Sequence, residues 1–148
     1  MAEQTVKLTF PAKADYLLLA RLALSGLGRG LSLDEESLAD LKLAVTEACG
    51  NVVRHAYKSS EGSVRVVYVV GDGRLEMIVE DEGTGLALAD IGVEDGLDEL
   101  PEPAELASFE GGMGMAIIRA VVDELEVHDG ENGRGTVVHM TKYLGAAA

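Results

Sequence analysis

The stretch TEACGNVVRHAY, Thr46–Tyr57, ends a long segment that has the apolar spacing of an amphipathic helix. The helix is predicted to begin after an N-cap at Asp34, which acidic residues follow. Its apolar stripe consists of Leu38, Leu41, Val45, Ala48 and Val52. Glu47 and Asn51 lie one turn apart, about 120° from the centre of that stripe. This position predicts either a solvated pair or a pocket-facing carboxylate and amide, which could accept a proton and bind Mg2+.

The segments on either side of this helix predict strands and further helices. Strands are predicted at residues 5–10, 63–70, 75–81, 125–129 and 136–144. Pro11 ends the first strand, and helices are predicted at residues 13–30 and from about Met115. The last two strands form a hairpin in which His128 and His139 could face each other. This order predicts an α+β fold, a two-layer α/β sandwich with about three helices on one face of a mixed, mostly antiparallel sheet.

Composition indicates one globular domain spanning residues 1–148, with 47% hydrophobic and 26% charged residues. Twelve basic and 26 acidic residues give a net charge of −14. This charge argues against direct binding to nucleic acid or an anionic membrane and suits a protein partner with a basic surface. No apolar run approaches the ~20 residues that span a membrane, and no secretion signal is visible, so we expect a cytoplasmic protein. Cys49 is the single cysteine, which excludes an internal disulfide and argues against a thiolate zinc site.

The hairpin over residues 63–81 runs into an acidic, glycine-rich cluster, EDEGTGL. Asp81 would lie at the edge of the sheet, where its carboxylate could accept a hydrogen bond from an exocyclic amine such as that of adenine. Gly83 and Gly85 leave the following backbone free to adopt positive φ. Because aspartate and glycine are favoured in turns, the cluster by itself also fits a simple acidic turn.

A second cluster, EGGMGMAII, leads into the helix predicted near Met115. Gly111, Gly112 and Gly114 would let a phosphate approach the backbone N–H groups of a helix N-terminus. They could instead form a flexible joint after residues 87–110, a predicted loop or lid with eight acidic residues and no basic residue. The cluster matches neither the P-loop nor the dinucleotide-binding fingerprint.

Taken together and in this order, the motifs resemble those of the GHKL (Bergerat-fold) ATPases, the superfamily of gyrase, histidine kinases and MutL. Within it the chain looks most like the anti-sigma factor serine kinases of bacterial stress and sporulation switches. The stretches that carry the resemblance are VTEACGNVVRHAY, VEDEGTGL, GGMGMAIIRAVVDELEV and GRGTVVHMTKYL. The resemblance covers residues 6–144 and implies a Bergerat ATP-binding fold, a histidine kinase-like ATPase domain in which residues 87–110 form the ATP lid.

The resemblance also implies a role for individual residues. Glu47 would act as general base on the attacking hydroxyl, and Asn51 would coordinate an Mg2+ ion that bridges the ATP phosphates. Asp81 would bind the adenine amine, with Thr136 helping through water. Glycines would line the nucleotide, Gly83 and Gly85 at the adenine and Gly111, Gly112 and Gly114 at the phosphates.

The implied function is that of a serine/threonine protein kinase that uses ATP and Mg2+. It would phosphorylate an anti-anti-sigma (STAS-type) partner and, when not engaged by it, sequester a sigma factor. A homodimer is implied as well, and the apolar first helix, Tyr16–Leu27, could belong to its interface or to the core.

One departure from the family pattern separates ATP binding from phosphotransfer. No Lys or Arg occurs between Arg74 and Arg119, so the lid has no basic residue that could steady the γ-phosphate. ATP binding is therefore a firmer expectation than kinase activity. The alternatives are a nucleotide-gated anti-sigma or adaptor module without phosphotransfer, and an acidic α/β domain whose glycine clusters are only loops.

Overall fold

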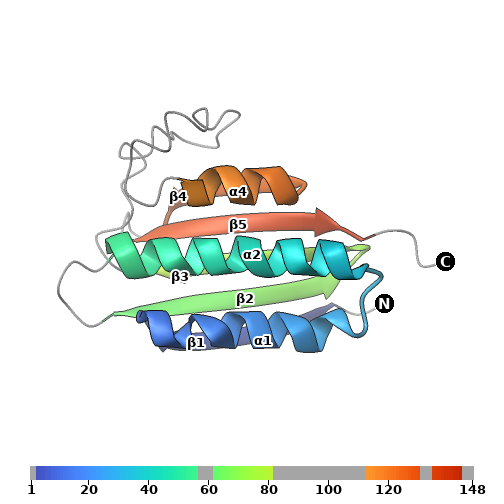
Figure 1. Cartoon of the computed structure of the whole chain (residues 1–148), viewed down its shortest axis with the longest axis horizontal. Coiled ribbons are helices and arrows are strands. Elements are labelled where there is room, and N and C mark those ends of the chain that lie inside the picture. Colours follow the sequence, from blue (N-terminus) through green and yellow to red (C-terminus); the bar gives the residue numbers. More distant parts are fainter. Residues whose placement is uncertain (1–2, 57–61, 82–112, 131–134, 145–148) are drawn as a thin grey trace.

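One layer of the structure is a five-stranded sheet with the order β1-β2-β3-β5-β4 (Figure 1). The strands are β1 Gln4–Pro11, β2 Ser63–Gly71, β3 Arg74–Asp81, β4 Glu124–Asp129 and β5 Thr136–Tyr143. The computed structural model describes residues 3–56, 62–81, 113–130 and 135–144. Within these ranges every neighbouring pair of strands is antiparallel, so the mostly antiparallel sheet is confirmed without a mixed pair.

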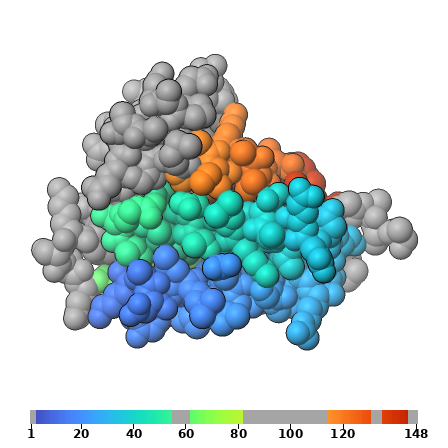
Figure 2. Space-filling model, in the orientation of Figure 1, coloured from blue at the N-terminus to red at the C-terminus, as the bar shows by residue number. Residues whose placement is uncertain are grey.

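The other layer consists of helices on one face of this sheet (Figure 1). The α-helices of the described residues are α1 Leu17–Gly28, α2 Glu35–Asn51 and α4 Met113–Val121. A 3-10 turn η1, Ala14–Tyr16, precedes α1, and a π-helical turn η2, Val52–Ala56, continues α2. On the face shown in Figure 2, α2 lies between α1 and α4. The predicted α+β two-layer sandwich is confirmed, and none of these helices is long and apolar enough to cross a membrane.

The helix that carries Glu47 and Asn51 forms as its sequence predicts. Asp34 is the N-cap of α2, and its carboxylate accepts a hydrogen bond of 2.7 Å from the backbone N–H of Ser37. This hydrogen bond holds the pKa of the Asp34 carboxyl below its usual range. The predicted apolar stripe packs on the sheet, because its central residues Leu41, Val45 and Ala48 are fully buried.

The core between the layers also holds two polar side chains. The hydroxyl of Tyr68 on β2 donates a hydrogen bond of 2.6 Å to the carbonyl oxygen of Ala20, which ties α1 to the sheet. Cys49 on α2 is fully buried, and burial raises the pKa of its thiol to about 12. The thiol is therefore uncharged at neutral pH, which argues against a role as nucleophile.

The strand boundaries differ from the sequence-based expectation by one residue, and α1 is shorter than the helix predicted at residues 13–30. The first strand ends at Pro11 as expected, but Pro11 itself belongs to β1 and pairs with Ser63, which a proline tolerates because β1 is an edge strand. Helix α4 begins at Met113 rather than near Met115. The β2–β3 turn agrees with the sequence, since Asp72 and Gly73 both have positive φ, as the tight two-residue hairpin turn requires.

The β4–β5 hairpin corrects one expectation about histidines. His128 lies opposite Val137 and His139 lies opposite Glu126, so the prediction that the two histidines face each other is wrong. A register shift of two residues separates them, and sequence spacing could not fix that register. His139 instead contacts Glu76 on β3, with 2.8 Å between Nε2 and Oε1.

Candidate functional site

Asp81 and Thr136 reach the site from the ends of two neighbouring strands. Alternate residues of β3 are buried against the helices, and the same alternation turns the side chain of Asp81 toward them. Because β3 and β5 pair antiparallel, the last residue of β3 lies beside the first residue of β5, which is Thr136. Both polar residues are nearly inaccessible, 6% exposed for Asp81 and 4% for Thr136. A carboxylate and a hydroxyl thus lie at strand ends, on the sheet face whose other buried residues are mostly apolar.

Asn51 faces the same region from the last residue of α2. It is 5% exposed, and its Nδ2 atom donates a hydrogen bond of 3.4 Å to the sulfur of Met115 on α4. The predicted shoulder position of Asn51 therefore turns out to be buried under α4. The alternative of a solvated asparagine is wrong.

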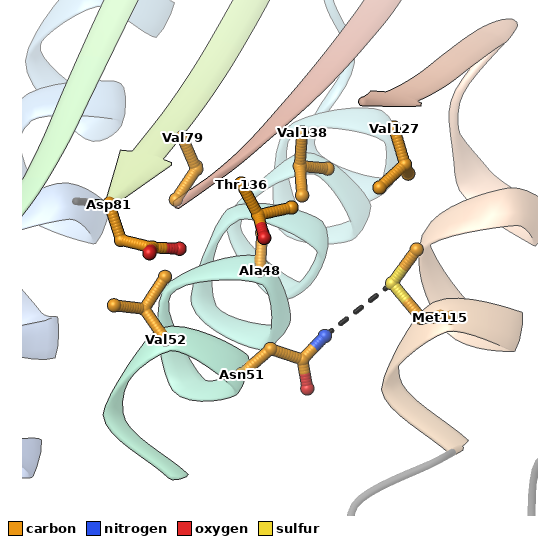
Figure 3. Close-up of a pocket in the computed structure, with 9 residues that line it drawn as sticks. All are labelled: Ala48, Asn51, Val52, Val79, Asp81, Met115, Val127, Thr136 and Val138. Carbon is orange, nitrogen blue, oxygen red and sulfur yellow. Dashed lines mark hydrogen bonds between the residues drawn. The ribbon is translucent and has the colours of Figure 1, made fainter. Parts of the chain in front are cut away.

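These three polar residues line one pocket between α2, α4 and the sheet (Figure 3). The other lining residues are Ala48, Val52, Val79, Met115, Val127 and Val138. In Figure 3 the Asp81 carboxylate points into the pocket from the sheet side, while Asn51 and Met115 lie across it. The pocket is therefore mainly apolar, with a few polar groups that converge on it, as is usual for small-molecule sites.

Glu47 lies one turn before Asn51, beside the first turn of α4. Its side chain is 26% exposed. A Cβ atom added to Gly114 would lie 2.7 Å from Glu47 Oε2 and 3.6 Å from Asn51 Oδ1. The structure thus brings together Glu47, Asn51 and Gly114, which the sequence had placed in two separate motifs. The missing side chain at Gly114 is what allows α4 to approach the carboxylate so closely.

Two residues at the site were not predicted to belong to it. The guanidinium of Arg54, on the π-helical turn, donates a hydrogen bond of 2.7 Å from Nη2 to Asn51 Oδ1. Met115 is fully buried, as expected of a core residue, but its sulfur also orients the Asn51 amide. The spacing of three residues between Asn51 and Arg54 was the available signal, since such pairs meet on a helix.

Several residues expected at the site lie outside the described part of the chain. They are Gly83, Gly85, Gly111 and Gly112, together with the expected lid at residues 87–110. Their roles stay predictions. Of the predicted site residues, the structure describes Glu47, Asn51, Asp81, Gly114 and Thr136.

The described residues fit a nucleotide that brings its own metal ion. Asp81 offers a buried carboxylate inside an apolar pocket, where a hydrogen-bond donor such as an amine would be held strongly. No group of three or more His, Cys, Asp or Glu side chains in the described ranges could hold a metal ion by itself. Mg2+ commonly uses one or two protein oxygens and completes its shell with phosphates and water. The Asn51 amide oxygen fits that requirement, and the nearby Glu47 carboxylate stays available as a base.

A two-layer sandwich with a pocket beneath its helices is the architecture in which the family comparison finds an ATPase-type domain. The model of the family "Histidine kinase-like ATPase domain" matches residues 10–142, so the chain belongs to this family and the resemblance to GHKL ATPases is confirmed. Similar relatives include the serine-protein kinase RsbW of Bacillus cereus (strain AH820) and that of Bacillus anthracis (strain CDC 684 / NRRL 3495). Each is 31% identical over 142 residues, which cover 95% of this chain and 86% of the relative.

Two solved structures share the fold. The RsbU and RsbW domains of a Mycobacterium tuberculosis protein match with a TM-score of 0.63 and 21% identity, over 98% of this chain and 34% of that one. The chain thus spans about a third of that protein's length. The mycobacterial sensor histidine kinase MprB matches with a TM-score of 0.51 and 18% identity, over 97% and 98%.

Proposed function

We propose that this chain is an ATP-binding anti-sigma factor and a serine/threonine protein kinase. It would phosphorylate an anti-anti-sigma partner of the STAS type and sequester a sigma factor. The observation that carries the proposal is the meeting of Asn51, Asp81 and Thr136 in one pocket, with Glu47 one turn away on α2. The relatives named serine-protein kinase support the transferase part.

The proposed chemistry assigns one task to each described side chain. Asp81 accepts a hydrogen bond from the adenine amine, with Thr136 beside it. Asn51 would hold Mg2+ at the phosphates, where the metal would supply positive charge to the transferred group. Glu47 removes the proton of a serine hydroxyl while the serine oxygen bonds to the γ-phosphorus. The bond from that phosphorus to the β–γ bridging oxygen breaks, and ADP leaves.

A second candidate function is a nucleotide-gated anti-sigma or adaptor module that transfers nothing. The absence of Lys and Arg between Arg74 and Arg119 favours it, because transferred phosphoryl groups usually meet a cationic side chain. In both versions the nucleotide occupies the same pocket. The homodimer and the cytoplasmic location stay predictions in either case.

The test compares wild-type protein with Glu47→Gln and with a control, Glu126→Gln on β4. Glu126 is exposed and lies opposite His139 on the hairpin, and strand alternation turns its side chain away from the face on which Val127 lines the pocket. Proteins from the source cell that the chain retains are incubated with γ-labelled ATP and Mg2+. We expect wild type and the control to label a small retained protein, and Glu47→Gln to label it about 10²–10⁴-fold more slowly. ATP affinity, measured by calorimetry, should stay within about twofold, because a base acts on the transition state.

The other outcomes are equally informative. Transfer at the wild-type rate by Glu47→Gln would remove Glu47 from the role of base. ATP binding without any labelled protein would favour the nucleotide-gated module. A chain that binds no ATP at all would overturn both versions.

A further inference from the structure

The guanidinium of Arg54 occupies the place between the two side chains that carry the proposed chemistry. Its Nη2 atom lies 2.7 Å from Asn51 Oδ1 and 3.9 Å from Glu47 Oε2. The first distance is that of a good hydrogen bond and the second that of a long ion pair. The main partner of Arg54 is therefore the amide oxygen of Asn51, the proposed metal ligand.

The backbone of α2 is shaped to receive this guanidinium. Gly50 lies inside the helix, where glycine is less favourable than almost any other residue. A Cβ atom at Gly50 would lie 3.0 Å from Arg54 Nη1 and 3.6 Å from its Cζ. The guanidinium thus folds back over a residue that has no side chain. Arg54 itself stands on the π-helical turn that follows Asn51, and such turns are frequent at functional sites.

A metal ion and this guanidinium compete for the same oxygen. An Mg2+ ion lies about 2.1 Å from an oxygen ligand. With Arg54 Nη2 at 2.7 Å from the same atom, the two positive charges would be separated by less than about 5 Å, where they repel each other. The Arg54 side chain is 36% exposed, so it has a path into solvent.

We propose that Arg54 takes the place of the metal ion at Asn51 Oδ1 in the nucleotide-free protein and must leave Asn51 when a metal nucleotide binds. The inference rests on the proposed function, since it requires Asn51 to be the metal ligand. Only molecules in which Arg54 has left Asn51 can bind the metal nucleotide. The apparent Kd is therefore the intrinsic Kd divided by the fraction of molecules in that state. Arg54 thereby sets the affinity for Mg-ATP.

The experiment measures the Kd of ATP by calorimetry, once with excess Mg2+ and once with EDTA. Arg54→Met removes the guanidinium and keeps an apolar stem. Arg65→Met removes one positive charge from the exposed part of β2 and serves as the matched control. We expect Arg54→Met to bind Mg-ATP about three- to tenfold more tightly than wild type, and to change metal-free ATP binding less than about twofold. The control should change neither value by more than about twofold.

Gly50→Ala displaces the guanidinium without changing the net charge. The added Cβ would crowd Nη1, so Arg54 should leave Asn51 more often. We expect tighter Mg-ATP binding in this variant as well, with its melting temperature showing that α2 stays folded.

Three results would overturn the inference. Weaker Mg-ATP binding by Arg54→Met would make Arg54 a phosphate contact instead of a competitor. Equal changes with and without Mg2+ would place its effect away from the metal ligand. If wild type binds Mg-ATP but neither variant binds it more tightly, Arg54 does not compete, and the proposed function is untouched. Only a wild-type chain that binds no ATP would remove the proposed function and this inference together.

Discussion

At the scale of single residues, Asp81 is a carboxylate at a buried position where its strand otherwise carries apolar residues. The alternation of β3 would place an apolar residue there, because the positions two and four residues earlier are Val79 and Met77. A carboxylate at a buried position is costly unless hydrogen-bond donors surround it. Its place at the wall of a mainly apolar pocket fits the proposed recognition of an amine-bearing ligand.

Replacing Asp81 by Asn tests this reading. The substitution keeps the shape but removes the charge and turns one acceptor into a donor, so the adenine amine loses a charge-assisted hydrogen bond. We expect ATP to bind about 1.5–3 kcal/mol more weakly, measured by calorimetry. Asp72→Asn is the control, because Asp72 lies in the β2–β3 turn with positive φ, which asparagine tolerates. Unchanged affinity in Asp81→Asn would mean that adenine lies elsewhere.

The residues of the site differ in how far sequence could predict them. Asp81 and Asn51 follow from motif spacing, and the structure places both in one pocket. The spacing of Arg54 from Asn51 allows a contact between them but does not single it out, because the contact also depends on a π-helical turn and on Gly50 leaving room above the helix. Neither feature has a residue pattern of its own. The contact of Met115 with Asn51 depends on how α4 packs on α2, which is a tertiary property.

At the scale of elements, the approach of α4 to α2 is the contact that shapes the end of the site where Glu47 lies. Helices and strands follow from periodicity, since apolar stripes and alternation are properties of the local sequence. The crossing of two helices is not local. Gly114 shows why. A side chain is excluded there by the Glu47 carboxylate of the other helix, which the sequence around Gly114 does not reveal.

Gly114→Ala should separate folding from activity. Alanine favours a helix by up to about 1 kcal/mol over glycine. The new Cβ would lie 2.7 Å from Glu47 Oε2, so the flexible end of Glu47 must move. We expect an unchanged or higher melting temperature and a phosphotransfer rate lower by about tenfold or more, because small misplacements of a base are costly.

The matched control for this substitution is Gly26→Ala on α1. A Cβ atom at Gly26 would meet nothing within 4 Å, so this variant should gain stability and keep the wild-type rate. A normal transfer rate in Gly114→Ala, with Gly26→Ala behaving as expected, would show that the position of Glu47 does not limit the reaction.

At the scale of the whole molecule, the two faces of α1 have different surroundings. Ala20 and Leu24 are buried in the core, as expected of an amphipathic helix. Leu18, Leu19 and Leu22 are 54%, 43% and 56% exposed on the same helix. Their spacing of three and four residues places them together on the surface of α1. A chain with a net charge of −14 has no solubility reason to gather leucines there, which fits the predicted homodimer.

The double substitution Leu18→Glu and Leu22→Glu should convert such a dimer into single chains. Both side chains are more than half exposed, so the fold loses little and the melting temperature should change only slightly. Two buried charges at an interface centre should weaken association about 30-fold or more, read from sedimentation at several concentrations. Leu43→Glu on α2, 43% exposed, is the control that should keep the wild-type mass.

If wild type sediments as one chain at every concentration, the exposed leucines do not mediate self-association, and the proposed sigma factor is the first other partner to test. If the double variant stays a dimer, the interface lies on another element, and the exposed leucines of α1 are left without a role in self-association.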